Sequence, residues 1–279
     1  MLATRILTAL VLVPSTLAAL FLLSAQGWAL VSLAVIGVAA AEWANLAALR
    51  GPARLGFVAG TLVLGGWLLF AGAAGFDRGW PEPVVLAACG AATLFWLAVV
   101  PFWLRRRWRA SSPLAMAVVG WLVLVAAWVA IAQLQARSPW LVLAAMAIVW
   151  IADTAAYFSG RAFGRRKLAP MISPGKTWEG VYGALIAVAI YAAALVPYAR
   201  GAGYTGVADA GRIAAWIALA LVLTGLSICG DLFESLLKRQ AGVKDSGKLL
   251  PGHGGVLDRT DALLAAMPAA AVAILVFLR

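Results

Sequence analysis

Residues 114–135 read LAMAVVGWLVLVAAWVAIAQLQ and contain no charged side chain. A hydrocarbon core about 30 Å thick is crossed by roughly 20 apolar residues in helical form, so this stretch is long enough to span a membrane. Ser111-Ser112-Pro113 precedes it and Ser138-Pro139 follows it, and such breakers are typical of the connections between helices. The stretch therefore predicts one transmembrane helix.

The whole chain has this apolar character. Of its 279 residues 64% are hydrophobic and 12% are charged, and the mean hydropathy is +0.96. Soluble domains are about 45–50% apolar and about 25% charged, so the composition excludes a soluble globular protein, and it also excludes intrinsic disorder. The net charge of +11 does not indicate a nucleic-acid partner, because the basic residues fall between apolar runs. Cys89 and Cys229 lie in separate apolar segments and predict no disulfide framework.

Nine stretches are candidates for transmembrane helices, and they predict an all-α polytopic membrane protein. They cover residues 6–24, 28–47, 56–75, 84–104, 114–135, 139–158, 180–199, 212–236 and 261–278. The first follows Arg5 and resembles a signal peptide, but no convincing cleavage site follows it, so we expect it to be retained.

The distribution of basic residues predicts the orientation. With a cytoplasmic N-terminus, 17 of the 22 Lys and Arg residues fall in inside segments. The five in outside segments are Arg78, Arg137, Arg200, Arg212 and Arg279. Because cytoplasmic loops carry an excess of Lys and Arg, we expect the N-terminus inside and the C-terminus outside.

The acidic residues are concentrated late in the chain, where eight of the 11 follow residue 150. Asp231 and Lys238 fall on one helical face, and Asp258 and Asp261 are three residues apart. Carboxylates at a membrane-embedded helix end are costly unless they are paired or bind a metal ion, and such oxygen ligands suit Mg²⁺. The spacing leaves open the alternative that these acids only form ion pairs with Lys238, Arg239 and Arg259. Glu42 stands inside an expected span, and either a site role or a structural partner would explain it.

Two polar segments, 153–180 and 230–261, combine glycine with lysine, serine and threonine. This mixture favours phosphate binding, since backbone amides and cations can converge on anionic oxygens. A Walker A loop is rejected because position 170 is proline where that loop needs glycine. His253, the single histidine, could donate to a phosphate, transfer a proton or simply stabilise a turn. We therefore divide the chain into an N-terminal transmembrane region, 1–110, and a C-terminal transmembrane catalytic region, 111–279.

Residues 235–261, SLLKRQAGVKDSGKLLPGHGGVLDRTD, closely resemble the signature of the phosphatidate cytidylyltransferases. Residues 173–180, SPGKTWEG, are similar to a second characteristic stretch of that family. The resemblance implies transfer of CMP from CTP to phosphatidic acid, which gives CDP-diacylglycerol and pyrophosphate for phospholipid synthesis. It also implies dependence on Mg²⁺, with a monovalent cation such as K⁺ beside it, and a homodimer. The compact loops favour a bacterial source, in which case we expect the inner (cytoplasmic) membrane.

The resemblance and the residue chemistry together give a set of expected site residues. The resemblance implies metal ligands at Asp231 and Asp258, with Asp261 as a supporting acid. We expect the groups that act at the reacting phosphates to be Asp231, Asp258, Lys238, Arg239 and His253. We expect the residues that hold the nucleotide to be Lys167, Ser173, Lys176, Thr177, Lys244 and Lys248.

Two other functions remain open at this level. A transporter or channel also places polar residues at interrupted helices, but this chain shows no paired broken segments in its two halves. A related CTP-using lipid enzyme, such as a polyprenol kinase or an archaeal-type cytidylyltransferase, is the other alternative. The reaction product separates these functions.

Overall fold

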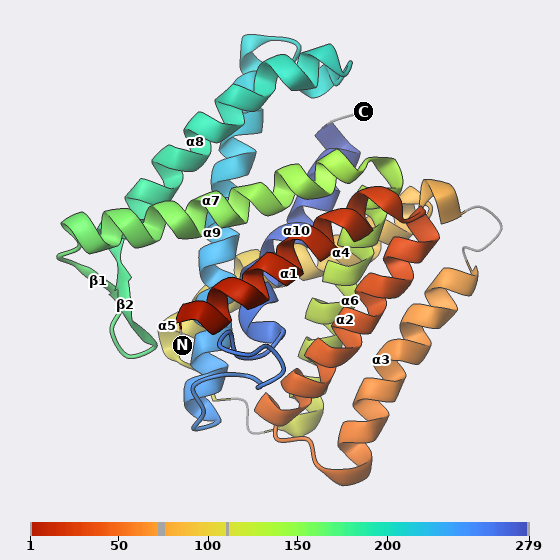
Figure 1. The fold of residues 1–279 in the computed structure, drawn as a ribbon, viewed down its shortest axis with the longest axis vertical. Coiled ribbons are helices and arrows are strands. Elements are labelled where there is room, and N and C mark those ends of the chain that lie inside the picture. The colour runs from red at the N-terminus through yellow and green to blue at the C-terminus, as the bar shows by residue number, and fades with distance from the viewer. Residues whose placement is uncertain (1, 72–75, 110–111, 278–279) are drawn as a thin grey trace.

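The structure is a computed structural model that describes residues 2–71, 76–109 and 112–277 (Figure 1). Arg279, and the last residues of the expected spans 56–75 and 261–278, lie outside the described residues.

Within that part of the chain the fold is a bundle of nine helices, one of which changes its winding midway. Their bounds are α1 Leu2–Leu22, α2 Ala25–Leu46, α3 Gly51–Ala71, α4 Glu82–Leu94 continued through the π-helical turn η2 Phe95–Val99 into α5 Val100–Arg106, α6 Pro113–Arg137, α7 Pro139–Phe163, α8 Trp178–Gly201, α9 Ala210–Gln240 and α10 Leu257–Phe277. Short 3₁₀ turns, η1 Phe76–Arg78 and η3 Thr205–Val207, lie in two connections.

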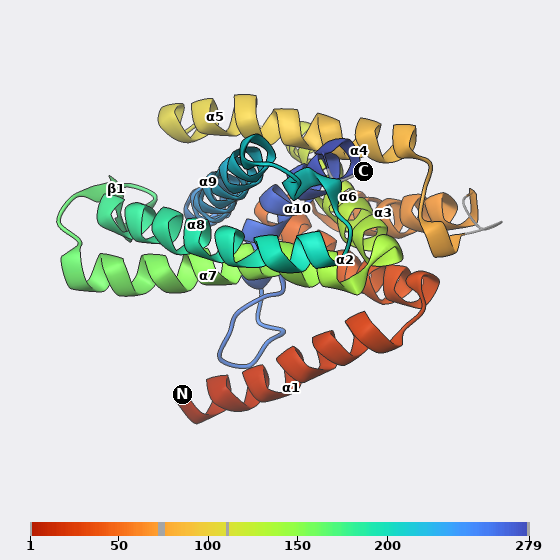
Figure 2. The ribbon, with the colours of Figure 1, turned by 90° about the horizontal axis from the view of Figure 1, so that it is seen from above.

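Eight of the described helices are long and apolar enough to cross a membrane, which confirms a polytopic helical membrane protein. The ninth, α1, has a shorter apolar part, Leu7–Leu22. Figure 2 shows α1 on one flank of the bundle, next to the connection between α9 and α10. There Thr8 Oγ1 donates a hydrogen bond to the carbonyl oxygen of Pro251 (3.0 Å). The orientation of the termini in the membrane stays a prediction.

The helices begin where the sequence places capping residues and prolines. Side-chain oxygens of Ser24, Ser112, Thr177 and Asp209 each accept a hydrogen bond from the backbone N–H three residues ahead. Proline in the first turn of α4, α6 and α7 fits there because those first N–H groups have no helical partner. The expected breakers therefore act as helix starts.

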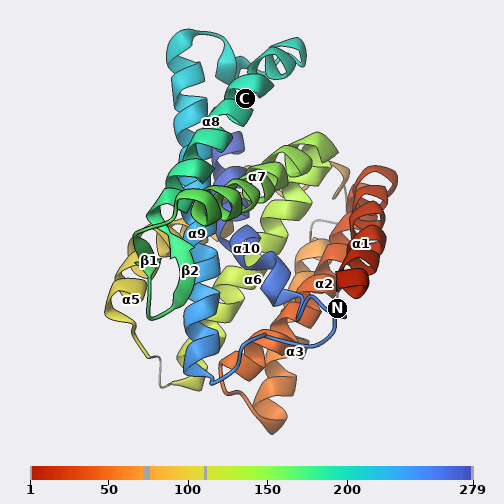
Figure 3. The same cartoon turned by 60° about the vertical axis from the view of Figure 1, so that its left-hand side comes forward.

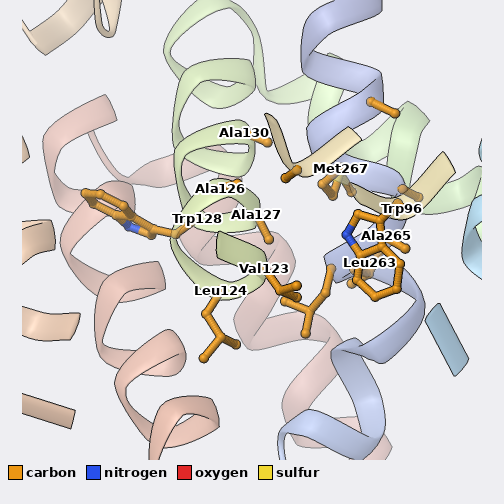
Figure 4. Close-up of a cluster of buried hydrophobic side chains, with 14 of the residues drawn as sticks. Trp96, Val123, Leu124, Ala126, Ala127, Trp128, Ala130, Leu263, Ala265 and Met267 are labelled. Carbon is orange, nitrogen blue, oxygen red and sulfur yellow. The ribbon is translucent and has the colours of Figure 1, made fainter. Parts of the chain in front are cut away.

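The centre of the bundle is α10, which packs against α4, α6, α7 and α9. Its buried face is rich in alanine, and small side chains let neighbouring helices approach closely in a membrane. Figure 4 shows this core, where Ala265 and Met267 of α10 meet Trp96 of η2 and residues of α6.

An aromatic cluster fixes α9 against the N-terminal region. Phe233 of α9 lies 6.4 Å, between ring centroids, from Trp43 of α2, 5.6 Å from Trp96 and 5.3 Å from Trp103 of α5. These contacts set the position of Glu234, the next residue along α9.

A small antiparallel hairpin connects α7 to α8 and adds two short strands to the predicted helical fold. Strand β1, Lys167–Ala169, pairs with β2, Ser173–Thr177, so that Lys167 stands opposite Thr177 and Ala169 opposite Ser173. Figure 3 shows the hairpin beside α9, on which β2 packs.

Candidate active site

Lys238 of α9 joins two buried carboxylates. Its Nζ donates to Glu234 Oε2 and to Asp258 Oδ1, each at 2.6 Å. The lysine side chain is 14% exposed and each carboxylate is 4% exposed, so all three charges are largely removed from water. Glu234 lies one helical turn before Lys238, whereas Asp258 belongs to the first turn of α10. The ion pair therefore fixes the start of α10 to the end of α9.

Asp258 is fully engaged in this arrangement. Its Oδ2 accepts hydrogen bonds from the backbone N–H of Gly255 (2.8 Å) and from both the backbone N–H (2.9 Å) and Oγ (3.0 Å) of Ser246. With Lys238 on Oδ1, both carboxylate oxygens have partners. Asp258 and Glu234 thus form ion pairs with Lys238, as the ion-pair alternative predicts for such acids.

Glu42 reaches this segment from α2. It accepts hydrogen bonds from Ser246 Oγ (3.0 Å), whose single hydrogen is shared between Glu42 and Asp258, and from Val256 N–H (3.0 Å) and Leu257 N–H (2.8 Å). The last two are backbone groups at the start of α10, where a helix has no partners of its own for them.

The two polar segments meet at Lys176 and Asp231. Lys176, on β2, forms an ion pair with Asp231 of α9, and both side chains are partly exposed. Asp231 also accepts a hydrogen bond from Ser235 Oγ (3.3 Å). Asp153 of α7 and Asp261 of α10 lie within electrostatic range of Asp231. The hairpin and α9 thus meet at this ion pair, and Asp153 and Asp261 are near enough to interact with it electrostatically.

Tight packing at three glycines holds the hairpin there, and the first is Gly160, where a Cβ would lie 3.0 Å from Thr177 Oγ1. A Cβ at Gly164 would collide with the carbonyl oxygen of Gly160 and with Thr177, and a Cβ at Gly180 would come within 2.9 Å of the carbonyl oxygen of Ala156. Thr177 is buried and caps α8 through Gly180 N–H. Thr177 and these glycines therefore position the hairpin at the junction of α7 and α8.

The whole chain is similar to known cytidylyltransferases. The model of the cytidylyltransferase family matches residues 3–277. The chain belongs to this family. It is 42% identical to a phosphatidate cytidylyltransferase of Pseudomonas aeruginosa over 96% of the chain and 95% of that protein. It is 37% identical to one of Haemophilus influenzae, covering 96% of each, and 38% identical to one of Brucella suis, over 95% of the chain and 90% of that protein.

Four of the expected site cations of this cytidylyltransferase stand apart from the buried network. The exposed set consists of Lys167, Arg239, Lys244 and Lys248. Among the described residues, none of the four forms an ion pair. Ser173 is half-buried at the start of β2. Exposed lysines and arginines without acidic partners are available to phosphate groups, which fits their expected role.

His253 lies in the turn that precedes α10. Its carbonyl oxygen accepts a hydrogen bond from Arg259 Nε (3.0 Å), and its N–H donates to the carbonyl oxygen of Leu250 (2.9 Å). The buried Nδ1 has no hydrogen-bond partner among the residues that the structure describes. The backbone of His253 thus stabilises the turn, whereas Nδ1 of its ring takes part in none of these hydrogen bonds.

The carboxylates of this cytidylyltransferase fit Mg²⁺ in part. Within the described residues, no three Asp, Glu, His or Cys side chains converge as a ready-made metal site. Mg²⁺ is usually held by one or two carboxylates together with substrate phosphates, so a smaller set suffices. Asp231 and Asp261 lie within electrostatic range of each other, and Asp231 is partly exposed. Its Oδ1 accepts from Ser235 and its Oδ2 pairs with Lys176, so these two contacts would have to open for Asp231 to bind a metal ion. Asp258 offers no free oxygen while it is bonded to Lys238.

The sequence did not reveal two parts of the site. Ser246 links Glu42 to Asp258, and the backbone N–H groups of Gly255, Val256 and Leu257 take part as donors. The one available signal was Glu42 itself, a carboxylate within a span that must have a partner.

Proposed function

We propose that this cytidylyltransferase transfers CMP from CTP to phosphatidic acid, giving CDP-diacylglycerol and pyrophosphate. The observation that carries the proposal is the 42% identity to a phosphatidate cytidylyltransferase over nearly the full length of both chains. The meeting of Lys176, Asp231, Lys238 and Asp258 at one end of α9 supports it.

The protein does not need to supply the nucleophile for this reaction. A phosphate oxygen of phosphatidic acid attacks the α-phosphorus of CTP, a new P–O bond forms, and the bond to the β-phosphate breaks. The lipid phosphate is already a competent nucleophile, so catalysis consists mainly of positioning two polyanions and neutralising the charge on pyrophosphate.

The exposure of each side chain indicates which substrate phosphate it can contact. Lys176, on the hairpin, is partly exposed and close to Asp231, so it suits a phosphate of CTP. The exposed Lys167 lies on β1 of the same hairpin, and the exposed Lys244 and Lys248 lie on the connection between α9 and α10. All three offer further positive charge. Ser173, Thr177, Arg239 and His253 remain candidates for nucleotide or phosphate contacts.

We propose Mg²⁺ at Asp231 and Asp261, where the ion would neutralise the triphosphate and the leaving pyrophosphate. Asp258 could join them only by releasing Lys238, which would then be free to bind a phosphate. A monovalent cation beside Mg²⁺ is a further part of the proposal.

The metal proposal predicts a change in the Mg²⁺ requirement. Asp231→Asn should lower the rate about 10- to 100-fold and raise the Mg²⁺ concentration that gives half the maximal rate. Asp209→Asn is the control, because Asp209 is an exposed carboxylate at the opposite end of α9. An unchanged Mg²⁺ dependence in Asp231→Asn would contradict the metal role.

Location and assembly are also proposals. The excess of basic residues around the site favours the cytoplasmic face of a bacterial inner membrane, where CTP is available. The family resemblance supports a homodimer, which the mass of the protein in detergent would test.

Pyrophosphate release tests the choice of acceptor. Purified protein in detergent with CTP and Mg²⁺ should release pyrophosphate when phosphatidic acid is added, and should release none with diacylglycerol, which lacks the nucleophilic phosphate. Equal release with both lipids, or with neither, would contradict the proposed acceptor.

A further inference from the structure

Glu42 belongs to the N-terminal region, yet its partners all come from the segment before and at the start of α10. It lies on α2, 204 residues before Ser246, and is 6% exposed. None of the ion pairs among the described residues includes Glu42. A buried carboxylate without a cation needs strong hydrogen-bond donors, and Ser246, Val256 and Leu257 supply them.

The segment 246–257 is shaped around this carboxylate. A Cβ at Gly247 would collide with Glu42 Oε1, and a Cβ at Gly255 would collide with Glu42 Oε2. Glycine at both positions allows the backbone to close around the side chain. The fit therefore fixes the segment at both of its ends.

Ser246 extends the contact into the buried ion pair. Its Oγ lies 3.0 Å from Glu42 Oε2 and 3.0 Å from Asp258 Oδ2. Asp258 in turn accepts from Lys238 (2.6 Å). An unbroken set of polar contacts thus runs from α2, through Ser246 and Asp258, to Lys238 on α9.

We propose that Glu42 is a positioning residue for the cytidylyl transfer reaction. It holds the segment 246–257, so that Asp258, Lys238 and the cations of this connection face the substrates in a fixed arrangement. The N-terminal region thereby contributes a side chain that positions the active site. This inference rests on the proposed function.

Replacing Glu42 by glutamine has a definite physical consequence. Oε1 accepts from Val256 N–H, and Oε2 accepts from Leu257 N–H and Ser246 Oγ. In either amide orientation the NH₂ group faces a backbone N–H, so two donors oppose each other and a buried hydrogen bond is lost. The segment must then shift away from α2.

The test compares kcat and KM for CTP and phosphatidic acid in wild type, Glu42→Gln, Ser246→Ala and the double variant. We expect kcat/KM for CTP to fall about tenfold or more in Glu42→Gln. We expect a smaller fall in Ser246→Ala, which deletes only one hydroxyl group. The double variant should lose less than the product of the two single losses, because both act through one contact. Glu42→Asp, which keeps the charge, should recover part of the rate.

Gln133→Leu is the matched control. Gln133 is 2% exposed, and its Oε1 accepts from the backbone N–H of Trp80 (2.8 Å), away from the segment 246–257. This variant also leaves a buried backbone donor unpaired, so it should lower the melting temperature while kcat and KM stay at wild-type values. A merely structural role of Glu42 would give the same pattern.

Folded Glu42→Gln with wild-type kcat and KM would overturn the proposal. If Glu42→Gln fails to fold, Ser246→Ala decides, and wild-type kinetics in that variant would overturn it equally. Failure of the proposed function is a different result, since the wild-type protein would then form no CDP-diacylglycerol at all.

Discussion

Lys238 forms ion pairs with two buried carboxylates in the described structure. It is the cation for both Glu234 and Asp258, whose side chains are each 4% exposed. A buried ion pair is weak evidence for stability by itself, but removing one partner leaves uncompensated charge. Replacing Lys238 would therefore leave two buried carboxylates without a cation.

Lys238→Met should therefore lower the free energy of unfolding by about 3–5 kcal/mol. The measurement is thermal unfolding of the detergent-solubilised protein. Arg239→Met is the control for stability, because the adjacent Arg239 is exposed and forms no ion pair among the described residues. Equal melting temperatures of the two variants would show that Lys238 does not hold the network together.

Residue contacts could be predicted from sequence only where they are local. The helical spacing of Asp231 and Lys238 predicted one face, and Ser235, which lies between them on α9, donates to Asp231 (3.3 Å). The bonds of Lys238 to Asp258 and of Glu42 to Ser246 join residues 20 and 204 positions apart. No periodicity within one helix specifies which distant helix it meets, so these contacts required the structure.

The hairpin is the element that brings the first polar segment to the second. Its β2 strand carries Lys176 to Asp231, and its base is packed against Gly160, Gly164 and Gly180. The sequence did not predict these strands, because residues 167–177 lack the apolar–polar alternation of a half-buried strand. Helix positions were predicted far better, since long apolar runs bounded by proline, serine and glycine fix both existence and approximate ends.

Gly164→Ala tests the packing of this element. The added methyl group would collide with the carbonyl oxygen of Gly160 and with Thr177, so we expect a loss of about 1–3 kcal/mol in stability and a lower rate as Lys176 moves. Gly175→Ala serves as the comparison for stability, because a Cβ there meets nothing within 4 Å. Thermal unfolding and CTP turnover of both variants give the answer, and a stable, fully active Gly164→Ala would refute the packing role.

At the scale of the whole molecule, both regions share one core. α10 packs against α4, and the Phe233 cluster joins α9 to α2 and α5. The expected site residues lie on the hairpin, on the second half of α9 and on the α9–α10 connection, while η3 and the α8–α9 connection lie at the opposite end of α9 (Figure 1). This separation gives the orientation prediction a clear test.

Single cysteines at the two ends of α9 should differ in accessibility. In a background without Cys89 and Cys229, Ala208→Cys in the α8–α9 connection should react with a membrane-impermeant maleimide in intact spheroplasts. Lys248→Cys in the α9–α10 connection should react only after the membrane is opened, because the excess of Lys and Arg places it inside. The reverse pattern would invert the proposed topology.

The most direct measurement follows the two ends of the CTP triphosphate. Purified protein in detergent receives phosphatidic acid, Mg²⁺ and CTP labelled either at the α- or at the γ-phosphate. Cytidylyl transfer predicts that α-label enters the lipid phase while an equal amount of γ-label appears as pyrophosphate. Entry of γ-label into lipid would identify a lipid kinase instead, and no transfer of either label from a folded preparation would contradict the enzymatic function proposed for this chain.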